Sequence, residues 1–147
     1  MPGVTSIKMS AFADCKSLET MVVPEGVTSL PNWVFQNCES LKNITLPSTL
    51  TSISTWVFEN CKSLVSITIP SKVTSYGSGV WTGCTSLKEV ILQNETPCNI
   101  NKSAFPLDTN EDLVIYVPDA SLEAYKAHAA WSVEEFKGRI YAISTRQ

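Results

Sequence analysis

The chain has 147 residues, of which 44% are hydrophobic and 17% charged, a composition that fits one globular domain with a sizeable core. It carries 11 basic and 14 acidic residues, a formal net charge of −3, and no arginine precedes Arg139. The basic residues are scattered, whereas a nucleic-acid binder clusters them, and no apolar run approaches the ~18 residues of a membrane span. We therefore expect neither a nucleic-acid partner nor a membrane-spanning segment in this chain.

One phrase recurs along the sequence. It reads FADCKSLETMVVP at 12–24, FQNCESLKNITLP at 35–47, FENCKSLVSITIP at 58–70 and WTGCTSLKEVILQ at 81–93. A shorter phrase precedes each copy: VTSI, VTSL, LTSI and VTSY, from positions 4, 27, 50 and 73. The interval is 23 residues each time. A fixed period of this length is typical of solenoids, in which each repeat buries its apolar face against its neighbours.

Each copy predicts one coil of such a solenoid. In the second copy the pattern LxxIxLP predicts a short strand, with Ile44 and Leu46 pointing inward and Asn43 and Thr45 outward. The proline that follows has no N–H to donate and ends the strand. VTSI predicts a second short extended segment, and the stretch from Phe35 to the cysteine predicts a tight turn. The residues before the four cysteines are types that tolerate positive φ well: Asp14, Asn37, Asn60 and Gly83.

The pattern AFxxCxSLxxIxLPxxVTSI resembles the BspA-type leucine-rich repeat, a 23-residue class found in bacterial surface proteins. The resemblance covers residues 4 to about 95, and a decayed fifth coil extends it to about 118. The sequence departs from the family pattern at Val34, Val57, Val80, Trp81 and Gln93. The resemblance implies an α/β repeat fold: a right-handed, curved leucine-rich-repeat solenoid with its short parallel strands on the concave side.

The periodicity changes toward the C-terminus. We assign residues 1–118 to about five coils, the first truncated, and residues 119–147 to a C-terminal cap of helices and a strand. DASLEAYKAHAA predicts a helix capped by Asp119 or Ser121, and its apolar face is Leu122, Tyr125 and Ala129. SVEE predicts a capping box at Ser132 for a second helix that ends near Gly138, and RIYAI predicts a last strand. Such a cap would cover the open end of the core.

The N-terminus begins in mid-coil, because PGVTSI at 2–7 matches PEGVTSL at 24–30 with one residue missing. MPGVTSIKMS also lacks the apolar stretch of a secretion signal. We expect the natural protein to carry further coils and an export signal upstream of Met1.

Three kinds of chemistry could explain the repeated cysteines. Disulfides are disfavoured because the side chains of successive cysteines point the same way. A metal site and a catalytic thiol are both disfavoured because the cysteines are 23 residues apart and His128 is the only histidine in the sequence. We favour a structural ladder of buried free thiols whose S–H groups donate weakly to loop carbonyls. Its members are Cys15, Cys38, Cys61 and Cys84. Cys98 lies outside this column, and its reactivity stays open.

The outward residues of the strands form the first candidate partner-binding surface, a flat and nearly neutral strip. It consists of Thr20, Val22, Asn43, Thr45, Ser66, Thr68, Glu89, Ile91, Val114 and Tyr116. Such a strip could contact a protein at little cost in desolvation. The alternative is that it is simply a solvated face.

Trp33 and Trp56 form the second candidate, because they occupy equivalent positions where other coils have small residues. We expect the two indoles to stack on the outer flank as an aromatic platform for a partner or a sugar ring. Gly77, Ser78 and Gly79 should leave open space in the next coil. The alternative is that each indole merely covers a neighbouring coil.

The sequence shows no acid–base pair, nucleophile–histidine pair or phosphate loop, so we predict no catalytic residue, no metal and no cofactor. We interpret the chain as a non-enzymatic protein-interaction or adhesion module, a fragment of a secreted or cell-surface protein. The resemblance implies adhesion to host matrix or to other cells, with a protein ligand; a carbohydrate ligand is kept open. The alternative function is a structural spacer that projects another domain from the cell surface.

Overall fold

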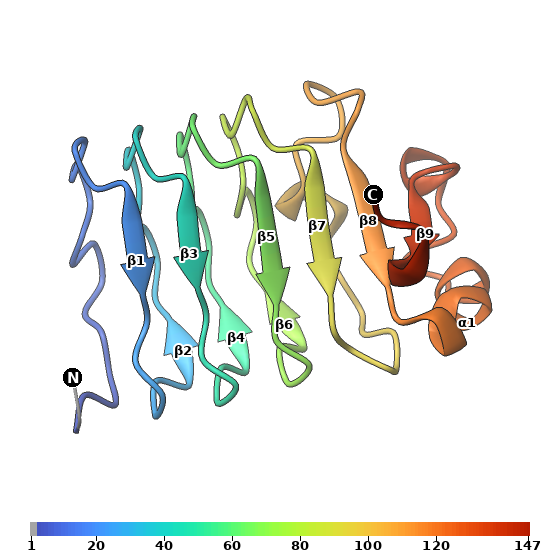
Figure 1. Ribbon diagram of the computed structural model, residues 1–147, viewed down its shortest axis with the longest axis horizontal. Coiled ribbons are helices and arrows are strands. Elements are labelled where there is room, and N and C mark those ends of the chain that lie inside the picture. The colour runs from blue at the N-terminus through green and yellow to red at the C-terminus, as the bar shows by residue number, and fades with distance from the viewer. Residues whose placement is uncertain (1–2) are drawn as a thin grey trace.

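The computed structural model describes residues 3–147, so Met1 and Pro2, which belong to the predicted truncated coil, lie outside the described residues. The chain winds into a row of coils that runs from the N-terminal end to the C-terminal end (Figure 1). In Figure 1 the chain descends along the front strands and returns behind them while it advances to the right, which makes the winding right-handed. The predicted right-handed solenoid with short parallel strands is therefore confirmed.

The front of the solenoid is formed by strands from the four copies of the longer phrase and from the decayed fifth coil. They are β1 (Thr20–Val22), β3 (Asn43–Thr45), β5 (Ser66–Ile69), β7 (Glu89–Leu92) and β8 (Val114–Val117), followed by β9 (Ile140–Ala142). β1 pairs with β3, and β5, β7, β8 and β9 form a second ladder, with every pairing parallel. The 23-residue period sets the register, since Ile67 lies opposite Val90 and Met21 opposite Ile44. The same columns of the sequence therefore share one face.

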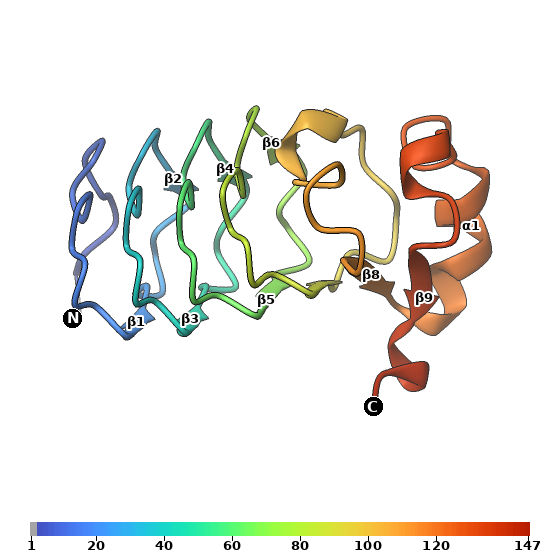
Figure 2. The same ribbon diagram turned by 90° about the horizontal axis from the view of Figure 1, so that it is seen from above.

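The shorter phrase forms a second parallel sheet behind the first (Figure 2). It consists of β2 (Ser29–Leu30), β4 (Ser52–Ile53) and β6 (Ser75–Tyr76). The turns between the two sheets place Asp14, Asn37 and Asn60 at φ values of 62°, 58° and 60° and Gly83 at 75°, as predicted. The side chains of the first three form a ladder, because Asn60 donates to Asn37 and Asn37 to Asp14, each at 2.8 Å.

An aromatic column runs through the core. Phe35 stacks on Phe12 at 5.5 Å and on Phe58 at 5.6 Å between ring centroids, and Trp81 extends the column to Phe105 at 5.0 Å. Phe35, Phe58 and Trp81 are fully buried. Offset aromatic stacks add to the energy of area burial, so this column joins each coil to the next.

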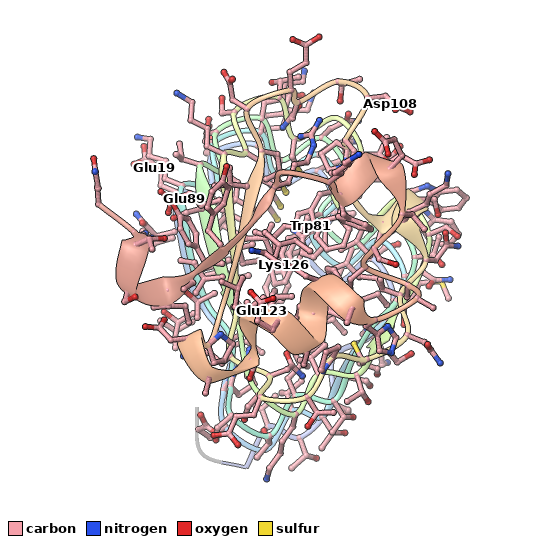
Figure 3. The ribbon with its side chains drawn as sticks, turned by 90° about the vertical axis from the view of Figure 1, so that its right-hand side faces the viewer. Glu19, Trp81, Glu89, Asp108, Glu123 and Lys126 are labelled. Carbon is pink, nitrogen blue, oxygen red and sulfur yellow. The ribbon has the colours of Figure 1, made fainter. Side chains whose placement is uncertain are left out.

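The C-terminal end is closed by a different packing, seen end-on in Figure 3. The chain after β8 forms, in order, the 3-10 helix Asp119–Ser121, α1 (Leu122–Ala127), the 3-10 helix Glu134–Phe136, β9 and the 3-10 helix Ile143–Thr145. One more 3-10 helix, Lys102–Ala104, lies in the fifth coil. Trp131 and Phe136 meet the last ring of the column, Phe105, edge-on at 6.0 and 5.5 Å. Arg139 donates to the carbonyl oxygens of Leu107, Asn110 and Leu113 at 2.9–3.2 Å. The last strand was predicted correctly.

Three details of the predicted helices were wrong. α1 ends at Ala127, so Ala129 lies beyond the helix and is exposed. Ser132 forms no capping box, because the second segment is a single 3-10 turn that begins after Val133 without a side-chain cap. Ser121 precedes α1, but its hydroxyl donates to the Glu95 carbonyl at 2.6 Å and makes no capping bond.

Candidate partner-binding surfaces

The strand face is open over the first three front strands. Five of the predicted strip residues are exposed there: Thr20, Val22, Asn43, Thr45 and Thr68. Val22 is 70% exposed, more than any other large hydrophobic residue that is exposed in the described chain. The five side chains alternate with inward residues such as Met21 and Ile67, as the pleat of a strand requires. Ser66, Glu89, Val114 and Tyr116 are only partly exposed.

The expectation for Ile91 was wrong. Ile91 lies in register with Thr68 and Tyr116, yet only 8% of it is exposed. The C-terminal segment returns to this part of the face, where the Arg146 Nε donates to a Glu89 carboxylate oxygen at 2.6 Å. The open strip is therefore confined to β1, β3 and β5.

Paired charges flank the open strip. Lys42 lies 3.2 Å from Glu19, and Glu39 bridges Lys16 at 3.8 Å and Lys62 at 3.2 Å. Each pair is solvent-exposed and contributes little to stability. Because these charges neutralise one another across neighbouring coils, they leave the strip itself without a dominant sign of charge.

Trp33 and Trp56 stack as predicted, with ring centroids 5.6 Å apart and an interplanar angle of 17°. Trp56 is 39% exposed and Trp33 is partly buried. Both residues have positive φ, 59° and 54°, which is exceptional for a bulky side chain. This second left-handed column was not predicted, although Ser10 and Gly79 at the equivalent positions are residues that tolerate positive φ.

The space predicted beside the platform is filled. A β-carbon on Gly79 would lie 2.4 Å from the Trp56 ring, and one on Gly77 would lie 2.4 Å from the Thr55 backbone nitrogen. These glycines therefore admit the indole and the backbone of the preceding coil. They leave no open pocket at these points.

The cysteine column is buried in three of its four predicted members. Cys38, Cys61 and Cys84 are fully buried free thiols that donate to the carbonyl oxygens of Phe12, Phe35 and Phe58 at 3.2, 3.3 and 3.0 Å. Burial raises the pKa of Cys38 to about 12, and the adjacent Cys84 thiol together with burial raises the pKa of Cys61. Cys15 departs from the prediction because it is exposed in the first coil.

Within residues 3–147, no group of three or more histidine, cysteine, aspartate or glutamate side chains is placed to hold a metal ion. Across the same part of the chain, the helices are too short and too polar to cross a membrane.

Comparison with known proteins identifies the repeat. The family model described as the BspA type leucine rich repeat region matches residues 5–119 in six copies. A search of curated proteins finds no match.

Three solved structures share the fold. A leucine rich cell surface protein of Faecalibacterium prausnitzii A2-165 is 25% identical, with a TM-score of 0.54 over 77% of this chain and 39% of its own. The pneumococcal vaccine antigen PcpA is 18% identical, with a TM-score of 0.64 over 91% of this chain and 36% of its own. A leucine rich repeat protein of T. pallidum is 19% identical, with a TM-score of 0.55 over 96% of this chain and 81% of its own. The chain thus spans less than half the length of the first two.

Proposed function

Because the chain belongs to the BspA-type leucine-rich-repeat family, we propose that it is a non-enzymatic binding module that holds a protein ligand on the outward face of β1, β3 and β5. The observation that carries this proposal is the chemistry of that face. Its exposed side chains are uncharged and small, so a partner can cover them without stripping water from a charged group. Val22 offers apolar area at the edge of the strip.

We further propose that the module acts at the cell surface or outside the cell and contributes to adhesion. The relative from F. prausnitzii is described as a cell surface protein, which supports this location. The ligand in this proposal is a protein of the host matrix or of another cell surface. An extended face of parallel strands suits such a ligand because each coil adds another row of contacts.

Charge placed on the strip tests the proposal. In the variant Thr45→Arg/Thr68→Arg, two cations occupy exposed positions of β3 and β5; the control Ser29→Arg/Ser75→Arg places the same charges on exposed positions of β2 and β6. We expect the strip variant to bind cultured epithelial cells and immobilised matrix proteins about tenfold more weakly, and the control to bind like the wild type. Circular dichroism checks that both variants fold.

Equal binding by the two variants would contradict the proposed face. If the wild type itself bound neither cells nor matrix proteins, the module would instead serve as a spacer that projects another part of the protein.

A further inference from the structure

The front face changes in character beyond β5. At the outward position in the middle of β3 and β5 the side chains are small and exposed, Thr45 and Thr68. On β7, β8 and β9 the same row continues in register as Ile91, Tyr116 and Tyr141. The Tyr116 and Tyr141 rings lie 6.3 Å apart between centroids. The row of outward residues therefore becomes large and apolar or aromatic on the side of the C-terminus.

Residues 143–147, which we call the C-terminal strap, cross this second part of the face. The Ser144 backbone N–H donates to Asp119 Oδ1 at 3.0 Å, just after β8 ends. The Arg146 Nε donates to a Glu89 carboxylate oxygen at 2.6 Å, where β7 begins. The strap thus runs from the end of β8 to the start of β7, in front of the strands (Figures 1 and 2). Ile91 lies in the middle of β7 beneath this path, which explains why only 8% of it is exposed.

Few bonds hold the strap on the face. Within the described chain, the hydrogen bonds of Ser144 and Arg146 tie residues 144–147 to β7 and to the segment after β8, and the others run to the adjacent Ala142 and Ile143. Residues 144–147 are themselves exposed. A partly exposed ion pair such as that of Arg146 shifts an equilibrium by about fivefold at most. A segment with so few contacts belongs to the part of a protein that opens first.

A hollow lies where the strap meets the face. Its volume is about 400 Å³, and its walls come from the start of β7, from β8 and β9 and from the strap: Glu89, Val114, Tyr116, Tyr141, Thr145 and Gln147. Tyrosine is enriched among the residues that contribute most to protein–protein binding. The strap therefore lies over side chains that are well suited to a protein partner and that directly continue the open strip.

We propose that the C-terminal strap is a displaceable cover on the partner-binding face. The protein ligand that contacts β1, β3 and β5 displaces the strap and extends its contact across Ile91 and Tyr116. This inference rests on the proposed function, because the occupant is the same ligand, and one row of side chains in register joins Thr68 to Ile91 and Tyr116. The strap lowers the apparent affinity, since a ligand binds more weakly when only a fraction of the protein has its face uncovered.

A charge exchange tests the strap without any ligand. Arg146→Glu places a carboxylate opposite Glu89 and should release the strap, whereas Glu89→Arg/Arg146→Glu restores an ion pair with the charges exchanged. Ile91→Cys reports the cover and Thr68→Cys is its uncovered control, each labelled with a maleimide and quantified by peptide mass spectrometry. We expect Ile91→Cys to be labelled more slowly than Thr68→Cys, and about fivefold faster when combined with Arg146→Glu. The charge exchange should return it to the slow rate.

Binding to cultured epithelial cells and immobilised matrix proteins supplies the second readout. We expect Arg146→Glu to bind about threefold to fivefold more tightly than the wild type, and Glu89→Arg/Arg146→Glu to bind like the wild type. The strap is overturned if Ile91→Cys is labelled as fast as Thr68→Cys, if Arg146→Glu does not accelerate that labelling, or if Arg146→Glu binds no more tightly than a wild type that does bind. If neither the wild type nor any variant binds, the proposed function fails and the role of the strap fails with it.

Discussion

At the scale of single residues, the repeated cysteines differ in the surroundings that their coils provide. Cys15 is exposed, while Cys38, Cys61 and Cys84 are buried, and burial raises the pKa of Cys38 and of Cys98. Because only a thiolate reacts quickly with a disulfide reagent, we expect one fast thiol among the five at about pH 8. Titration with a chromogenic disulfide before and after unfolding in guanidinium measures this. Two or more fast thiols in the native protein would contradict the buried ladder.

The sequence predicted the chemistry of these thiols but not the exposure of Cys15. Its spacing and flanking residues are those of the other copies, so the four cysteines were assigned one environment. Exposure depends on whether a coil lies on each side of the residue, and that is a property of position along the stack. The open space predicted near Gly79 failed for a related reason, because the Trp56 side chain from the preceding coil fills it.

Two tyrosines allow a matched test of buried hydroxyl groups. The Tyr76 hydroxyl is buried and has no hydrogen-bond partner within the described part of the chain, whereas the Tyr125 hydroxyl donates to the Asn94 carbonyl at 3.1 Å. Tyr125→Phe should lower the free energy of unfolding by about 1 kcal/mol, because it leaves that carbonyl without its donor. Tyr76→Phe should leave stability unchanged or raise it. Urea unfolding of both variants measures the difference, and a larger loss for Tyr76→Phe would contradict the account.

At the scale of elements, the C-terminal segment substitutes for a further coil. Arg139 donates to three carbonyls of the fifth coil, and one of its donors bonds both Asn110 and Leu113. Arg139→Met should therefore lower the midpoint of urea unfolding by an amount equivalent to about 2 kcal/mol, since it leaves three partly buried acceptors unpaired.

Arg146→Met is the matched control for Arg139→Met. Its ion pair with Glu89 is partly open to solvent, so its loss should cost about 1 kcal/mol or less. Equal losses of stability in the two variants would show that Arg139 does not hold the end of the solenoid.

The strands and turns were predictable because their signal is local and repeated. Inward apolar residues alternate with outward polar residues around Ile44 and Ile67, and this pattern indicates the strands. Asn37 and Asn60 indicate the turns, because asparagine tolerates the positive φ that these positions adopt. The C-terminal segment lacks that repetition, so its helix lengths depended on tertiary contacts. Trp131 and Phe136, which close the aromatic column, were missed because nothing in the local sequence indicates which rings meet Phe105.

The candidate surfaces were predicted only in part. The outward positions of β1, β3 and β5 follow from the period, but Ile91 is covered, and no local pattern indicates that Arg146 reaches Glu89 on that face. The stack of Trp33 on Trp56 followed from the equivalence of their positions. The positive φ of Trp33 and Trp56 could not be predicted in the same way, because bulky residues rarely adopt it.

At the scale of the whole described chain, the first and third coils are buried to different extents. Phe12, Leu18 and Met21 of the first coil are only partly buried, whereas Phe58 and Leu64 two coils later are fully buried. In a solenoid, stability is shared between neighbouring coils, so a coil packed on one side opens more easily. We expect hydrogen–deuterium exchange to be fastest in residues 4–18 and slowest around β5 and β7. Equal protection in the first and third coils would contradict this gradient.

We propose that the molecule presents the open face of β1, β3 and β5 to a protein ligand, and site-specific photo-cross-linking would locate that contact. A benzophenone side chain at position 45 lies on that face, and one at position 29 lies on the exposed side of β2. After irradiation on epithelial cells or immobilised matrix proteins, we expect discrete adducts from position 45 and none from position 29. Adducts from position 29 alone, or none from either position while the protein remains bound, would contradict the claim.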